Sequence, residues 1–372
     1  MNKARSFESI TEGTTKVIVF KNKESKKGPG SKDKLPFYNP SMELNRDFSI
    51  LVCQWLINNS KKHVKILDGL AASGIRGIRF SNELNGNFDV TINDWNPNAF
   101  ILIDKNIEKL KLKNTISLNC NLNSLLSESK FDYIDIDPFG SPAYFIDSAM
   151  RSINKDGIIA CTATDTATLC GTYPKVCLRR YGAVPLHSPV MKEIGLRILL
   201  GFLCRIAGIY DKGIKPLVCY STDHYFRAYV QISNGTIRAN NSMRNYSTIK
   251  SNELFSKKSK KIDVGPMWID KIQKKRTIAE LRTILFEKSL KTKNELWKLL
   301  DLLEEEADGP AFFYTTDGLA SFLKKSPPKM EIISEKLKSK GYLFSRTHFC
   351  QTGFKTSASI NEIEKVFNQN QI

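Results

Sequence analysis

The chain has 372 residues, a formal charge of +18 at neutral pH and a hydrophobic content of 41%. This content excludes wholesale disorder, and the length suits two domains that each bury a core. The excess of Lys and Arg favours a polyanionic partner, most often nucleic acid, although a genome of biased base composition would also enrich Lys without any function. No secretory signal is evident. The most apolar long stretch, 194–210, carries Arg197 and Arg205, so no membrane span is expected.

The eight cysteines are scattered along the chain. No two of them have the C-x-x-C spacing of a zinc clip, so neither a metal site nor a disulfide framework is expected. The sequence therefore predicts a soluble, reduced protein of the cytoplasm, or of the nucleus if the source is eukaryotic.

Strand and helix patterns alternate after a Lys-rich segment, 21–34, which predicts a mobile basic loop. Strands are predicted at 64–70, 88–93, 115–119, 131–136 and 157–162, and helices at 74–84, 97–112, 142–153 and 189–210. This order predicts a largely parallel, doubly wound α/β sheet. Two further strands, 217–221 and 225–232, are separated by three residues, so they are expected to form an antiparallel hairpin.

Three regions are predicted along the chain. Residues 1–232 form the α/β domain with its basic N-terminal segment, and residues 233–264 form a basic, polar linker or surface insertion. Residues 265–372 form a smaller α+β domain with helical patterns at 277–288 and 294–307. Its last part shows helix, helix and strand patterns with a basic end, which resembles a winged helix.

The segment FDYIDIDPFGSP, residues 131–142, carries the strongest chemical signal. It predicts a buried strand that ends in a sharp turn, at the edge of the sheet where α/β proteins bind ligands. Asp137 offers an acceptor carboxylate, Pro138 a stiff backbone and Phe139 a ring for stacking. Together they suit an amino group on a flat base. The alternative is an ordinary Asp-Pro turn with Phe139 in the core.

The turn DGLAASGIRG, residues 68–77, follows the first strand. Its small residues let the backbone approach a ligand, and Gly74 permits tight contact between helix and strand. A dinucleotide-binding turn would need glycine where Ala72 stands. An acidic strand end, Asp68, before such a turn better suits S-adenosyl-L-methionine, whose amino-acid end is zwitterionic. Asp94, at the end of the second strand, would bind the ribose hydroxyls, or would merely cap the next helix.

Taken together, the motifs resemble the tRNA (guanine-26-N2)-dimethyltransferase family over most of the chain. They are FYNPSMELNRDFS (37–49), DGLAASGIRGIRF (68–80), DIDPFGSP (135–142), TATDTATLCG (162–171), DHYFRAYV (223–230), GPMW (265–268), and SRTHF followed by GFKTSA (345–358). The resemblance implies a class I S-adenosylmethionine-dependent methyltransferase domain, Rossmann-like with a terminal antiparallel hairpin, and a C-terminal domain that binds tRNA.

The resemblance also implies roles for single residues. It places cofactor contacts at Arg46, Arg76 and Asp94 and, after the third strand, at Asn121 and Leu122. It places the catalytic carboxylate on Asp137. Many members bind zinc through cysteine pairs between the motifs DHYFRAYV and GPMW, but this chain has no cysteine there, so no metal is expected.

The sequence thus predicts an enzyme that transfers two methyl groups from S-adenosyl-L-methionine to the exocyclic N2 of guanine 26 in tRNA. Two alternatives stay open: a methyltransferase for an exocyclic amine of another nucleic acid, and a non-catalytic RNA-binding protein on the same fold. The oligomeric state is not predicted.

Overall fold

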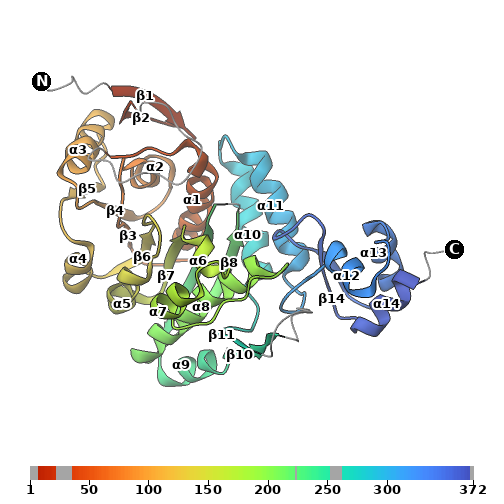
Figure 1. Ribbon diagram of the computed structural model, residues 1–372. Helices are drawn as coiled ribbons and strands as arrows, with labels where there is room; N and C mark the ends of the chain where they lie inside the picture. Colours follow the sequence, from red (N-terminus) through yellow and green to blue (C-terminus); the bar gives the residue numbers. More distant parts are fainter. Residues whose placement is uncertain (1–6, 22–35, 223, 252–261, 369–372) are drawn as a thin grey trace, which may run out of the picture.

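The computed structural model describes residues 7–21, 36–222, 224–251 and 262–368 (Figure 1). Its centre is a seven-stranded sheet of order β5-β4-β3-β6-β7-β9-β8. The first five strands in this order, β5, β4, β3, β6 and β7, run parallel to one another. Strand β9 runs antiparallel to both β7 and β8. The predicted doubly wound sheet and its closing hairpin are confirmed. The strands are β3 (Val64–Asp68), β4 (Phe88–Asn93), β5 (Thr115–Leu118), β6 (Phe131–Ile136), β7 (Ile153–Ala163), β8 (Lys212–Ser221) and β9 (Phe226–Asn234).

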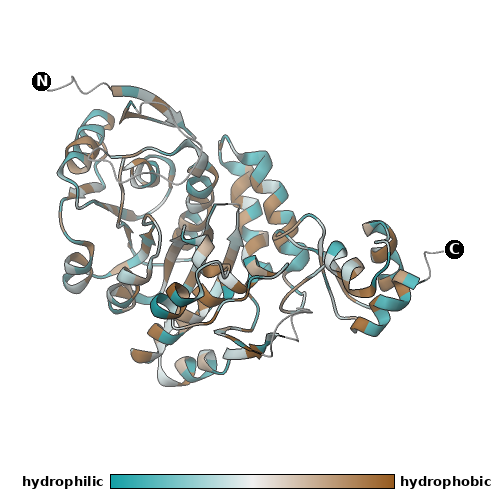
Figure 2. Ribbon diagram, viewed as in Figure 1, coloured by the Kyte–Doolittle hydropathy of each residue, from teal (hydrophilic) through white to brown (hydrophobic). Residues whose placement is uncertain are grey.

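Helices cover both faces of this sheet, because successive side chains of a strand point to opposite sides. Ile66 and Leu67 of β3, for example, belong to different hydrophobic clusters. One face packs against α4 (Leu122–Glu128), α5 (Ala143–Ser152) and α8 (Met191–Ile209). The other packs against α1 (Glu43–Asn58), α2 (Ile75–Glu83), α3 (Pro97–Leu110), α10 (Lys275–Glu287) and α11 (Lys293–Glu306). Figure 2 shows hydrophobic and hydrophilic residues interspersed along α10 and α11, as in amphipathic helices. No helix in the described part of the chain is long and apolar enough to cross a bilayer.

Several elements escaped the sequence analysis. They include the N-terminal hairpin of β1 (Phe7–Glu12) and β2 (Thr15–Phe20), the 3₁₀ turn Pro40–Met42, α1, α4, α6 (Thr166–Leu169) and α7 (Pro174–Tyr181). In α1 the polar residues Asn45, Arg46 and Asp47 are as buried as the apolar ones. An apolar stripe of helical period is therefore absent from its first turns, which hid the helix.

The region predicted as a linker or insertion, 233–264, is part of the fold where it is described. It contains α9 (Thr236–Met243), which packs against α8 and β8, and β10 (Tyr246–Lys250), which pairs with β11 (Asp263–Trp268). The Ser242 hydroxyl exchanges hydrogen bonds with the main chain of Ile214. A polar residue of this region therefore binds to the main sheet, and the described part of the region is not a free linker. Residues 252–261, and all but Lys21 of the predicted basic loop, lie outside the described residues.

The hydrophobic core does not divide at residue 265. Helices α10 and α11 share the core of α1 and the sheet. A separate cluster forms among residues 314–368, called here the C-terminal unit, which stands to one side in Figure 1. It comprises β12 (Tyr314–Thr315), α12 (Thr316–Leu323), α13 (Met330–Ser339), β13 (Phe344–Arg346), β14 (Gly353–Thr356) and α14 (Ile360–Asn368). Its strands form a sheet of order β12-β14-β13, and its likeness to a winged helix stays a prediction.

The outer edge of β8 is covered by side chains and main chain from later in the sequence. The main-chain N–H of Lys274 donates to the carbonyl of Leu217, and the amide of Gln273 bonds both main-chain groups of Cys219. The imidazole of His348 accepts from the N–H of Ser221. These contacts satisfy edge groups that would otherwise be open to another strand.

Candidate active site

A cavity of about 600 Å³ opens at the carboxyl ends of β3, β6 and β7, where an open α/β sheet binds its ligands. We call it the strand-end cavity. Six predicted site residues line it: Arg46, Asp68, Arg76, Asp137, Pro138 and Phe139. Its remaining lining includes Phe37, Thr164 and Thr166, and the hairpin residues Thr222, His224 and Tyr225.

Asp137 forms an ion pair with Arg76 at the cavity wall, and its side chain is 18% exposed. Nη1 of Arg76 donates to Asn45 at 2.8 Å and to Ser49 at 2.6 Å, both on α1. Burial opposes the charge of this guanidinium, but Asp135 and Asp137 together raise its pKa above the ordinary value. Arg76 is thus a fixed cation that orients the Asp137 carboxylate.

Asp135 lies two residues before Asp137, within the buried part of β6, and has a structural role. Its carboxylate accepts hydrogen bonds from both terminal nitrogens of Arg227, at 2.6 and 3.1 Å, and from the Tyr133 hydroxyl at 2.9 Å. Although burial opposes ionisation, Arg227 and Arg76 hold the pKa of Asp135 below its usual value. Because Asp135 is fully buried, Asp137 is the carboxylate of this motif that reaches the cavity.

The turn after β6 presents its aromatic ring to solvent and to the cavity. Gly140 donates its N–H to the Thr164 hydroxyl at 2.6 Å, and Thr164 donates its N–H to the Gly140 carbonyl at 2.9 Å. Gly140 has φ +88°, a conformation that favours glycine. Phe139 is 53% exposed, and its ring centroid lies 6.4 Å from that of Phe37. The alternative in which Phe139 packs in the core is therefore wrong.

The turn after β3 is held at both ends. The buried carboxylate of Asp68 accepts the N–H of Gly77 at 2.9 Å, and burial raises the pKa of Asp68 to about 7. Gly74 is the N-cap of α2 and has φ +78°, and a Cβ at this position would lie 2.5 Å from the side chain of Ile103. No described cation lies within ion-pairing distance of Asp68, although the charge of nearby Arg76 offsets part of the effect of burial on its pKa.

Four predicted cofactor residues lie outside the lining of the cavity: Gly74, Asp94, Asn121 and Leu122. The carboxylate of Asp94 accepts the N–H groups of Ala72 at 2.7 Å and Asn96 at 2.8 Å, and thereby fixes the glycine-containing turn. Burial raises the pKa of Asp94. Asn121 caps α4, and Leu122 is buried beneath Gly69. Cofactor contacts at these positions stay a prediction.

Arg46 is held by residues that the sequence analysis missed. Its Nε donates to Glu12 at 2.8 Å, its Nη2 donates to the carbonyl of Asn39 at 2.9 Å, and its guanidinium lies 5.3 Å from the centroid of the Tyr38 ring. Glu12 is 1% exposed and also accepts from Tyr38 and Arg79. The N-terminal hairpin thus positions a cation of the cavity, a contact that no local motif signals.

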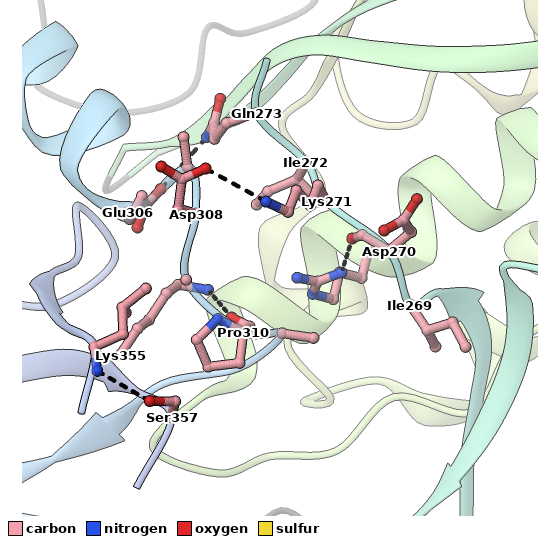
Figure 3. Close-up of a pocket in the computed structure, with 15 residues that line it drawn as sticks. Ile269, Asp270, Lys271, Ile272, Gln273, Glu306, Asp308, Pro310, Lys355 and Ser357 are labelled. Atoms are coloured by element: carbon pink, nitrogen blue, oxygen red, sulfur yellow. Dashed lines mark hydrogen bonds and ion pairs between the residues drawn. The ribbon is translucent and has the colours of Figure 1, made fainter. Parts of the chain in front are cut away.

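A smaller cavity, of about 340 Å³, lies where the end of α11 and β14 meet the segment after β11 (Figure 3). Its polar groups bond to one another or to the main chain: Lys355 donates to the carbonyl of Pro310 at 3.1 Å, and Lys271 pairs with Asp308 at 3.4 Å. It is the junction between the body and the C-terminal unit. Among the described residues no group of three or more His, Cys, Asp or Glu side chains is arranged to hold a metal ion.

A sheet of this order, with a glycine-containing turn after its first strand and an acidic turn at the same edge, defines a class I methyltransferase fold. Residues 13–368 match the family model for N2,N2-dimethylguanosine tRNA methyltransferase. The chain belongs to this family.

Relatives and a solved structure agree with this assignment. The tRNA (guanine(26)-N(2))-dimethyltransferase of Pyrococcus abyssi is 38% identical, over 94% of this chain and 95% of that protein. The protein of the same name from Methanobrevibacter smithii is 35% identical, over 90% of this chain and 92% of its own length. The structure of Trm1 from Pyrococcus horikoshii in complex with S-adenosyl-L-methionine superposes with a TM-score of 0.86 at 33% identity, and covers 96% of this chain and 99% of that one.

Proposed function

We propose that this protein is a tRNA (guanine-26-N2)-dimethyltransferase that uses S-adenosyl-L-methionine. The proposal rests on its family and on one observation, the placement of Asp137, Pro138 and Phe139 together at the strand-end cavity. An acceptor carboxylate beside an exposed ring is what an amino group on a planar base requires. The relatives from Pyrococcus abyssi and Methanobrevibacter smithii carry this activity in their names.

The residues of the cavity fit the cofactor. Asp68 is a buried carboxylate with one hydrogen bond and no described ion-pair partner, so the ammonium of the methionine end would complete it. Residues 70–73 form the adjoining wall. We place the ribose near Asp94 and the adenine near Asn121 and Leu122. When bound, the cofactor supplies an activated methyl group on its sulfonium.

The chain's own residues then position the base. The lone pair of the guanine N2 is delocalised into the ring, which makes this nitrogen a weak nucleophile. Asp137, with the carbonyl of Pro138, would accept its N–H hydrogens and direct the lone pair toward the methyl group. Phe139 and Phe37 would stack on a base flipped out of the tRNA. The ion pair with Arg76 keeps the Asp137 carboxylate oriented. A group that is already oriented before the reaction lowers the barrier by positioning alone.

Asp137 is also the nearest group to receive the proton that leaves N2. After the first transfer the nitrogen still carries one N–H. Once Asp137 has released the first proton to solvent, the same carboxylate would accept the second. Dimethylation therefore needs no second acceptor. It requires that the spent cofactor be exchanged for a second S-adenosyl-L-methionine, and that the methylated base stay in or return to the cavity.

The wider chain would hold the substrate. We propose that the C-terminal unit and the basic surface bind tRNA phosphates, and that the protein works in the cytoplasm. The positive net charge of the chain supports a polyanionic substrate: Lys and Arg number 56 against 38 Asp and Glu.

Two transcripts test the function. The purified protein, labelled S-adenosyl-L-methionine and a tRNA transcript with guanine at position 26 should yield N2,N2-dimethylguanosine after nuclease digestion. A transcript with adenine at position 26 should stay unlabelled. Label in neither transcript but in DNA or ribosomal RNA would support the alternative methyltransferase. No transfer to tRNA, DNA or ribosomal RNA would support the non-catalytic alternative.

A further inference from the structure

Helix α7 is hydrogen-bonded to two segments of the wall of the strand-end cavity. The Tyr181 hydroxyl at its end donates to Asp165 at 2.8 Å and accepts from Ser141 at 2.8 Å. Asp165 stands between Thr164 and Thr166, which both line the cavity. Ser141 follows Phe139 by two positions. The helix is therefore fixed to the turn that carries the aromatic ring.

The segment that contains α7 is positively charged. Residues 166–192 include four cations, Lys175, Arg179, Arg180 and Lys192, and no acidic residue. Lys175 and Arg179 are exposed. Within the described residues neither forms an ion pair, whereas Arg180 pairs with Asp165 at 3.2 Å. The mechanism above does not use Lys175 or Arg179.

Exposed apolar side chains accompany these cations. Tyr173, which precedes the helix, is 56% exposed, and Leu178 is 54% exposed. Tyr173 makes no side-chain capping bond to α7, so its ring is not required to begin the helix. Cations interleaved with an exposed aromatic ring suit a nucleic-acid strand, because the cations meet phosphates and the ring stacks on a base.

We propose that Tyr173 and α7 form the docking surface for the tRNA strand that flanks the target guanine. Lys175 and Arg179 bind phosphates of that strand, and Tyr173 stacks on a base next to the one that is flipped. The inference rests on the proposed function, since it assigns the contacts of that same substrate. The proposed surface binds the RNA beside the cavity, in addition to any binding by the C-terminal unit.

The test compares two double variants of equal charge change. Lys175→Ala with Arg179→Ala removes the cations of α7. Lys61→Ala with Lys62→Ala removes two exposed cations that precede β3, at the opposite, amino-terminal edge of the sheet. The α7 variant should raise KM for tRNA on the order of tenfold. It should also flatten the slope of log affinity against log salt by about 1.5 units, as two lost phosphate contacts require.

The α7 variant should keep the parent's affinity for S-adenosyl-L-methionine and its kcat at saturating tRNA. The Lys61/Lys62 control should match the parent in KM and in slope. Tyr173→Ala should raise KM on the order of tenfold while Tyr173→Phe keeps it near the parent, as stacking predicts.

Three outcomes would overturn the inference: an α7 variant with the parent's KM and salt slope, a control that loses as much as the α7 variant, or a loss confined to kcat. All three require a parent that methylates tRNA. A parent that does not do so would instead refute the proposed function, so the two failures are distinguishable.

Discussion

The Nε2 atom of His348 accepts a hydrogen bond from the main-chain N–H of Ser221, with 3.2 Å between the two nitrogens. The other ring nitrogen, Nδ1, lies 2.6 Å from Glu306 and therefore donates to it. Ser221 immediately precedes Thr222, which lines the strand-end cavity. The loop between β13 and β14 of the C-terminal unit thus contacts the hairpin that borders the proposed active site.

Replacement of His348 tests this coupling. In His348→Leu the buried carboxylate of Glu306 and the N–H of Ser221 both lose a partner, which should cost about 1–3 kcal/mol of unfolding free energy and lower kcat. His348→Gln should recover most of the unfolding free energy and of kcat, because its side-chain oxygen can accept the hydrogen bond from Ser221. Denaturant unfolding and steady-state methylation measure the two effects. A Leu variant with the stability and kcat of the parent would show that the contact is incidental.

Replacement of Asp137 tests the catalytic carboxylate. Asp137→Ala should slow methyl transfer on the order of 10²–10⁴-fold, because the N2 hydrogens lose their acceptor and Arg76 loses one of its two carboxylate partners. Asp137→Asn should retain part of the rate, since the amide oxygen still accepts a hydrogen bond. Single-turnover methylation at saturating cofactor separates chemistry from binding. The exposed Asp156 provides a matched control, and Asp156→Asn should keep the parent's rate, because Asn tolerates the φ of +63° at this position. If Asp137→Ala stays within a few-fold of the parent, Asp165 is the next residue to replace.

Cofactor binding should depend on pH through Asp68, whose pKa burial raises to about 7. The ammonium of the methionine end favours the ionised carboxylate, so affinity should rise about tenfold for each pH unit from 5 to 7 and then level off. Asp68→Asn should bind more weakly and without this dependence. Calorimetry of the parent and the variant across this range decides the matter. An equal pH dependence in both would remove Asp68 from the cofactor site.

Acid stability should depend on Glu193, a buried carboxylate that accepts hydrogen bonds from Arg197 and Lys355. Burial opposes its charge, but Lys355 and Arg197 lower the pKa of Glu193 from 4.5 to about 2. The unfolded chain therefore takes up this proton first as the pH falls. Stability that is complete above about pH 4.5 should be lost, on the order of 3 kcal/mol, as the pH falls toward 2.

The control removes the charge pair together. In Glu193→Gln with Lys355→Met, no carboxylate at this position titrates, so the fall in unfolding free energy below pH 4.5 should be shallower than in the parent. Urea unfolding at several pH values measures both proteins. Parallel curves would mean that other carboxylates account for the acid sensitivity.

The parts that could be predicted from sequence are those with local signals. Strand β6 was predicted with its observed ends, because a continuous apolar run stops at an Asp-Pro turn. The glycine-containing turn and Asp137 followed from the same reasoning. Contacts between distant segments could not be predicted: Glu12 meets Arg46 across 34 positions, and no pattern in either segment names the other. Likewise, α9 was hidden because its packing against β8 depends on polar bonds rather than on an apolar stripe.

The covered edge of β8 has a consequence for how the chain is made. The groups that close it, on Gln273, Lys274 and His348, are synthesised after β8 itself. Until they emerge from the ribosome, the edge of the main sheet is open, and an open edge strand pairs readily with other chains. A nascent or truncated chain that ends before residue 273 should therefore be prone to aggregate. The residues from Gln273 onward, once synthesised, protect the edge of the sheet from such pairing.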